Sequence, residues 1–144
     1  MIKRVVGFLS VGLVLAACGT ISPAKAMQSW VAQSNFETNV KVVISDARHS
    51  ARALSNPATD ANDLHTVCAV LNLDDTKLNA SLPTPDDQAS ALLARAYGDI
   101  GAGANECYEL RASQSGRARS LANLRKGVAL LSEGTARVAS QAQS

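Results

Sequence analysis

The side chains that could do chemistry in this sequence are few and lie far apart. His49 and His65 fall in different predicted helices and lack the spacing of metal ligands. The stretch Gly101-Ala102-Gly103 has no strand before it and no third glycine, so it does not match a phosphate-binding loop. No serine has the setting of a nucleophile elbow. We therefore predict no catalytic site, no metal site and no cofactor, and we expect each histidine to be solvated or capped.

Two pairs of adjacent aspartates, Asp74-Asp75 and Asp86-Asp87, have the residue type needed for general acid–base catalysis. Asp86-Asp87 follows Thr84-Pro85, which predicts a helix start with the threonine as cap and the aspartates at the positive end of the helix dipole. Asp74-Asp75 falls where an apolar stripe would otherwise continue, which predicts a break in that helix. We interpret both pairs as helix caps.

The first eighteen residues have the pattern of an export signal. Met1-Ile2-Lys3-Arg4 is a short basic start, and residues 5–17 are apolar apart from Ser10. This apolar run is too short to span a bilayer comfortably, which favours a signal peptide over a permanent membrane helix. The run ends in Leu15-Ala16-Ala17-Cys18, followed by a glycine.

The motif at residues 15–18 resembles the lipobox of bacterial lipoproteins. In that family the thiol of the motif's cysteine takes a diacylglyceryl group, and a dedicated peptidase then cuts before the cysteine. The resemblance implies that residues 1–17 are a signal peptide and that Cys18 is lipidated. It also implies that the protein is held at the cell membrane, facing the extracytoplasmic side. Each buried methylene contributes about 0.8 kcal/mol, so two or three acyl chains form a stable anchor.

A second cleavage site competes with this interpretation. Ala24-Lys25-Ala26 has the A-x-A form of the general signal-peptidase site, and cleavage after Ala26 would release a soluble protein that begins at Met27. The site lies far from the apolar run, which favours lipidation at Cys18. An uncleaved anchor is the third alternative.

Export places the other two cysteines, Cys68 and Cys107, in an oxidising compartment, where an even number usually pairs. Each lies in an apolar helical pattern, so we predict a disulfide between two helices. No histidine or basic residue lies directly beside either cysteine, which argues against a catalytic thiol. Two free buried thiols are the alternative.

The charges of the chain are balanced overall but unevenly placed. The 144 residues carry a net charge of +2, and removing residues 1–17 takes away two of the 14 basic residues and leaves 12 against 12 acidic ones. This balance excludes a strongly basic nucleic-acid-binding protein, and we expect no nucleic-acid partner. The last segment is nevertheless basic, and its candidate contact residues are Arg119, Arg125, Lys126 and Arg137.

These four basic side chains are the one feature that suggests a partner beyond the membrane itself. On the outer side of a last helix they could contact anionic lipid headgroups, an envelope protein or an acidic envelope polymer. Alternatively they form a solvated face, or they lie against the acidic body of the same molecule.

The elements that position these residues are predicted to be four amphipathic helices. Residues 18–33 are predicted to form a polar tether, in which Trp30 either caps the core, the alternative we favour, or rests at the membrane interface. A capping box at Ser34 and Glu37 begins the first helix. Apolar residues then repeat at intervals of three and four over about 34–55, 60–78, 85–113 and 117–138.

These helices, joined by short polar turns, predict an all-α fold. We expect residues 34–144 to form an up-down-up-down four-helix bundle with one interhelical disulfide. Gly101 and Gly103 each cost roughly 1 kcal/mol relative to alanine in the middle of a helix. They predict a close approach to the preceding helix, with a kink or a small ligand cavity as alternatives.

Three further stretches resemble small uncharacterised cell-envelope lipoproteins of actinobacteria: the helix around Cys68, the Leu82-Pro83-Thr84-Pro85-Asp86 start, and the segment from Ala96-Tyr97 to Glu106-Cys107. This resemblance brings no activity with it. We expect a lipid-anchored, non-enzymatic binding or scaffold module. The alternative is a small-molecule carrier or inhibitor-type helical module that uses a cavity near Gly101 and Gly103. Cleavage at Ala26 would release such a module from the membrane.

Overall fold

The computed structural model describes residues 21–109 and 113–144. Within these residues the chain forms five helices and no strand, so the all-α prediction is confirmed and the predicted number of four helices is wrong. The helices are α1 (Pro23–Gln33), α2 (Phe36–Ser55), α3 (Ala61–Asn79), α4 (Asp87–Glu109) and α5 (Gln114–Gln143).

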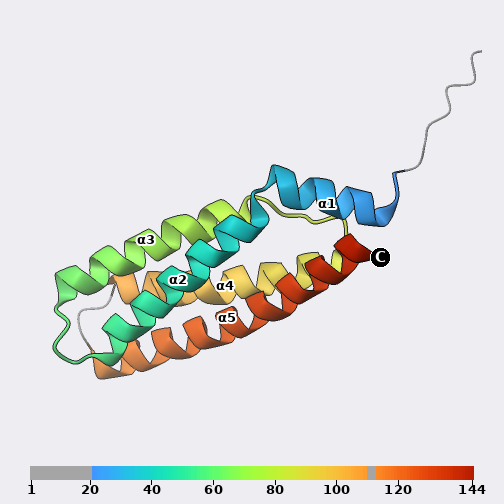
Figure 1. Ribbon diagram of the computed structural model, residues 1–144. Helices are drawn as coiled ribbons and strands as arrows, with labels where there is room; N and C mark the ends of the chain where they lie inside the picture. Colours follow the sequence, from blue (N-terminus) through green and yellow to red (C-terminus); the bar gives the residue numbers. More distant parts are fainter. Residues whose placement is uncertain (1–20, 110–112) are drawn as a thin grey trace, which may run out of the picture.

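The four longer helices, α2 to α5, lie side by side, and α1 packs across the end where α2 begins and α5 finishes (Figure 1). The most extensive contact is between α4 and α5, followed by α3 with α4. One core runs along the bundle. Its largest fully buried side chains are Tyr97, Phe36, Met27, Leu64, Leu71, Leu78, Leu93, Ile100, Leu124 and Leu131.

Helix α1 occupies most of the segment that the sequence predicts to be a tether. The Ser22 side chain accepts a hydrogen bond from the backbone N–H of Lys25, and Pro23 takes the first helical position, where its missing N–H costs nothing. Met27 is 1% exposed and belongs to the core. Residues 23–33 are therefore helical, where the sequence predicts a polar tether, and the Ser22-Pro23 pair is itself a helix-start signal.

The junction between α1 and α2 differs from the predicted capping box. The Ser34 hydroxyl donates to the carbonyl oxygen of Trp30 at 2.7 Å, so it ends α1 and does not begin α2. Asn35 turns the chain with a positive φ of 49°, a conformation that asparagine tolerates better than most residues. The indole N–H of Trp30 donates to the carbonyl oxygen of Ser81 at 2.9 Å, and its ring contacts that of Phe36. These contacts place Trp30 with the core, as favoured above.

Helix α3 begins as predicted and continues further than predicted. The Asp60 carboxylate accepts from the backbone N–H groups of Asn62 and Asp63, at 2.8 and 2.9 Å. The helix then runs without interruption through the predicted break at Asp74-Asp75. Asp75 is 5% exposed and lies on the inner side of the helix, so its interpretation as a helix cap is wrong.

Glycines bring α4 and α5 close together. A methyl group added at Gly127 would lie 2.8 Å from the backbone nitrogen of Ile100 and 2.9 Å from the carbonyl oxygen of Ala96, so the two backbones are nearly in contact there. A methyl group added at Gly103 would lie 2.8 Å from Cδ2 of Leu124. The close approach predicted at Gly103 is present, but its partner is α5 and not the preceding helix, α3.

Gly101 makes the contact with α3 instead. A methyl group added there would lie 3.1 Å from Oδ2 of Asp75. The space predicted as a small ligand cavity therefore holds the Asp75 carboxyl beside Gly101 and the Leu124 side chain beside Gly103.

Candidate functional site

The structure describes two of the three groups of sequence-predicted site residues, and these two lie apart. Cys18, with the rest of the motif at residues 15–18, lies outside the described residues. Cys68 and Cys107 form the predicted disulfide, which joins α3 to α4 with 5.8 Å between their Cα atoms. The four basic residues lie along α5. The structure therefore does not gather the predicted residues into one site.

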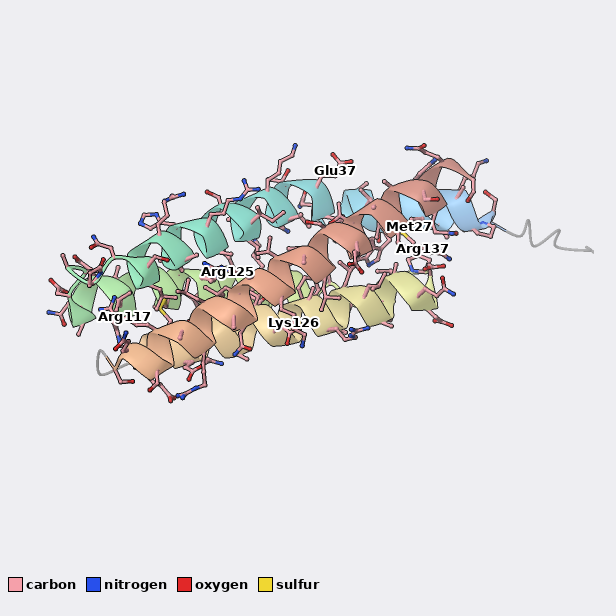
Figure 2. The ribbon with its side chains drawn as sticks, turned by 90° about the horizontal axis from the view of Figure 1, so that it is seen from below. Met27, Glu37, Arg117, Arg125, Lys126 and Arg137 are labelled. Carbon is pink, nitrogen blue, oxygen red and sulfur yellow. A yellow bond between two sulfur atoms is a disulfide. The ribbon has the colours of Figure 1, made fainter. Side chains whose placement is uncertain are left out.

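Three of the four basic side chains form ion pairs with carboxylates. Two of these carboxylates lie in α4, and the third lies just before α4 begins. Arg119 pairs with Glu106 at 2.6 Å, Lys126 with Asp99 at 3.0 Å, and Arg137 with Asp86 at 2.9 Å. Figure 2 shows Arg125 beside Lys126 on the middle of α5. Within residues 21–109 and 113–144, Arg125 is exposed and has no carboxylate partner. The predicted anionic contact therefore depends mainly on Arg125, and it stays a prediction.

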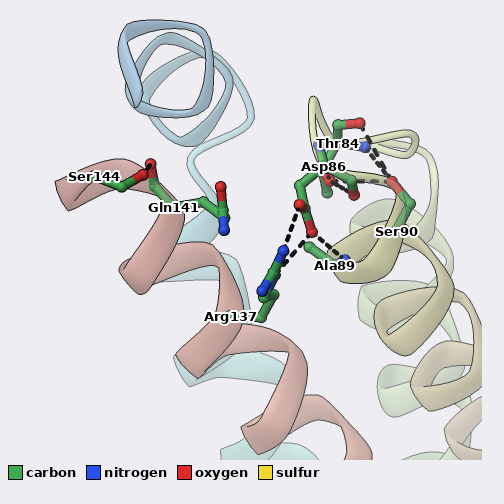
Figure 3. A network of polar contacts seen from close by, with 7 residues as sticks. All are labelled: Thr84, Asp86, Ala89, Ser90, Arg137, Gln141 and Ser144. Atoms are coloured by element: carbon green, nitrogen blue, oxygen red, sulfur yellow. Dashed lines mark hydrogen bonds and ion pairs between the residues drawn. The ribbon is translucent and has the colours of Figure 1, made fainter. Parts of the chain in front are cut away.

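The pair between Arg137 and Asp86 is the most elaborate of these contacts. The guanidinium donates from Nε and one terminal nitrogen to the two carboxylate oxygens, at 3.1 and 2.9 Å (Figure 3). Asp86 also accepts from the backbone N–H of Ala89 at 2.7 Å. These hydrogen bonds, the one from Arg137 first, hold the pKa of Asp86 below its ordinary value. Asp86 is thus the residue that caps α4.

Thr84, predicted as that cap, supports the turn before the helix. Its hydroxyl accepts from the backbone N–H of Asp86 at 3.1 Å, and it shares a hydrogen bond with the Ser90 hydroxyl at 3.0 Å. The helix consequently begins at Asp87, two residues later than Pro85.

A buried polar pair lies between α3 and α4, where the sequence predicts only packing. Asp75 is 5% exposed and Tyr97 is 1% exposed. Neither Oδ1 of Asp75 nor the hydroxyl of Tyr97 has a hydrogen-bond partner among the described residues. Such orphaned groups are rare in folded proteins because each forfeits its hydrogen bonds to water.

Burial raises the pKa of both groups. Removal from water disfavours the charged carboxylate and raises the pKa of Asp75 to about 7. Burial, with the nearby Asp75 charge as a smaller cause, raises the pKa of Tyr97 as well. Asp75 is therefore the buried residue whose charge can change near neutral pH. Sequence patterns missed it because an aspartate on an amphipathic helix is normally assigned to the outer face.

A groove of about 450 Å³ lies between α1, α2 and the end of α5. Its apolar lining includes Val31, Phe36, Val138 and Ala142, and polar residues such as Glu37 also line it. Its volume is within the range of small-molecule sites. The sequence gives no sign of this groove, because α1 forms one of its walls.

The comparisons add no assignment to this geometry. The chain matches no protein-family model, no curated protein and no solved structure. In the part of the chain that the structure describes, no three histidine, cysteine, aspartate or glutamate side chains come together as metal ligands. Over the same residues, each helix is too short or too polar to cross a membrane.

Proposed function

We propose that this chain is a lipid-anchored lipoprotein of the bacterial cell envelope whose helical body is a non-enzymatic binding or scaffold module. The observation that carries the proposal is the lipobox motif at residues 15–18, placed after a basic start and an apolar run. The disulfide between α3 and α4 supports an extracytoplasmic location, since such bonds persist mainly in oxidising compartments.

The position of α1 favours lipidation over release at Ala26. Cleavage after Ala26 would remove the first turn of α1 and the Ser22 side chain that caps it. It would also place a charged amino group on Met27, whose side chain is buried. A new charge beside the core is costly unless it is solvated or paired. Cleavage before Cys18 leaves α1 whole.

The lipidation proposal is tested by intact-mass analysis of the full-length chain expressed in a bacterial host that processes lipoproteins. We expect a mature protein that begins at Cys18 and carries at least the added mass of a diacylglyceryl group. Cys18→Ala should abolish both the cleavage and the added mass. The matched control, Ala26→Leu, removes the competing A-x-A site and should leave the mature mass lipidated. An unmodified protein that begins at Met27 would contradict the proposal.

The groove between α1, α2 and α5 supports a second candidate, a small-molecule carrier. Its apolar walls suit an apolar ligand, and Ala139 lines it while Ala136, one turn earlier, does not. A fluorescent fatty acid titrated into the detergent-free, chemically deacylated protein should bind saturably. Ala139→Trp should abolish this binding and Ala136→Trp should preserve it. If both variants bind like the unsubstituted chain, the groove is not a ligand site.

A further inference from the structure

The most unusual group in the molecule is the carboxyl of Asp75, which is buried and has no cation beside it. Asp75 lies on the inner side of α3, and its Oδ2 lies close to Gly101 of α4, 3.1 Å from where a methyl group at that position would be. Its other oxygen, Oδ1, has no hydrogen-bond partner among the described residues. A structural carboxylate would normally be paired or fully hydrogen-bonded, so packing alone does not explain an aspartate at this position.

The elements packed around Asp75 bring no positive charge to it. From α4 the titratable group that faces it is Tyr97, whose hydroxyl is also buried and unpartnered. From α2, the carboxyl of Asp46 faces Asp74, the chain neighbour of Asp75, and burial followed by this contact raises the pKa of Asp46. The three ion pairs of the described residues all lie between α5 and either α4 or Asp86 just before it. An ionised Asp75 would therefore be a buried charge without compensation.

Protonation of the Asp75 carboxyl removes this uncompensated buried charge. The protonated carboxyl is neutral, and its desolvation costs far less than that of the ion. The close contact between Asp75 and Gly101 then holds α3 against α4 without a buried charge. Loss of the proton makes the same contact unfavourable, because the anion needs water that the core does not supply.

We propose that Asp75 is a proton-operated switch in the core, which holds α3 against α4 when it is protonated and loosens that contact when it ionises. The inference goes beyond the proposed binding function and does not depend on the lipid anchor. The anchor would only determine the compartment in which the protein lies, and so the pH to which Asp75 responds.

The direction of the pH effect follows from the two protonation states. The folded chain holds the Asp75 proton up to about pH 7, whereas the unfolded chain releases it near the ordinary value of 3.8. The folded state thus binds more protons at Asp75 between these values, so the stabilising contribution of Asp75 is complete below about pH 4 and is lost as pH rises toward 7. Asp86 has the opposite shift and acts only at lower pH. A comparison of pH 5 with pH 8 therefore isolates the effect of Asp75 from that of Asp86.

The test is urea unfolding of the full-length chain in a mild non-ionic detergent, followed by the fluorescence of Trp30, the only tryptophan. From pH 5 to pH 8 we expect Asp75 to raise the unfolding equilibrium constant about 100-fold. Asp75→Asn, which mimics the protonated carboxyl, should lose this increase. Asp63→Asn removes an exposed carboxylate from the same helix and should keep it. An Asp75→Asn variant with the pH dependence of the unsubstituted chain would overturn the proposal.

A second measurement protects the test against a variant that fails to fold. In the unsubstituted chain, carbon-13 NMR should show the Asp75 side-chain carboxyl titrating near pH 7, and a midpoint below pH 5 would refute the switch. Hydrogen exchange, corrected for its intrinsic pH dependence, should be faster at pH 8 than at pH 5 for amides around residues 71–79 of α3. Unchanged protection of those amides would equally refute it, because the α3–α4 contact would then not respond to the proton.

Discussion

At the scale of single residues, glycines decide how closely α5 approaches α4. We expect Gly127→Ala to destabilise the protein by about 1–3 kcal/mol, the usual cost of overpacking. The added methyl group would meet backbone atoms of Ile100 and Ala96, which cannot rotate away as a side chain can. The measurement is the free energy of unfolding in urea.

The matched control for this substitution is Gly98→Ala on α4, where an added methyl group has no atom within 4 Å. It should stabilise the protein by up to about 1 kcal/mol, because alanine favours a helix and glycine does not. If Gly127→Ala stabilised the protein as Gly98→Ala does, the close approach of the two backbones would be disproved.

Asp75 shows what a residue-by-residue interpretation of the sequence can miss. The spacing of this helix predicts an apolar face of Leu64, Val67, Cys68 and Leu71, of which Val67 is partly buried and the other three are buried. Asp75 completes the same stripe between Leu71 and Leu78. Polarity predicts that such a residue breaks the helix or faces water. It packs against the glycine at position 101, which lies on another helix and far away in the sequence.

At the scale of elements, the amphipathic faces were predictable and the first helix was not. The buried residues Phe36, Val40, Val43, Ala47 and Leu54 follow the predicted face of α2. In contrast, α1 has few large apolar residues, and polar side chains alternate with small ones along it. Its helix is stabilised by Ser22 and Pro23 at its start and by packing on α2 and α5, and the second cause becomes visible only in three dimensions.

The partners of charged residues were equally beyond local patterns. Basic residues of α5 were expected on an outer face or, alternatively, against the acidic body of the molecule. The ion pairs of Arg119 and Arg137 with Glu106 and Asp86 agree with the alternative, but the sequence did not say which carboxylates they would meet. Which helix lies beside which cannot be deduced from periodicity, because each face is compatible with several neighbours. The sequence thus identified charged residues that take part in the α4–α5 contact, but it did not identify which residues pair with each other.

At the scale of the whole molecule, the two ends of the bundle are held by different means. At the end where α1 packs, Trp30 donates to Ser81 and Arg137 pairs with Asp86. At the other end, Arg117 donates to the carbonyl oxygens of Leu54, Asn56 and Thr59 and so ties α5 to the connection between α2 and α3. The disulfide also lies toward this second end, close to the last turns of α4.

This arrangement predicts an uneven response to loss of the disulfide. The bond joins cysteines 39 residues apart, so the chain-entropy argument gives about 4 kcal/mol of stabilisation. The Cys68→Ala/Cys107→Ala variant should be destabilised by about that amount in urea, and a reductant should weaken the unsubstituted chain but not the variant.

Hydrogen exchange should accelerate around Leu64 and Cys107 and change little around Leu78 and Ala89, because ion pairs and the α1 contacts hold that end independently. Uniform acceleration along the bundle would show instead that the molecule opens as one cooperative unit, and equal urea midpoints would show that the bond does not stabilise the fold.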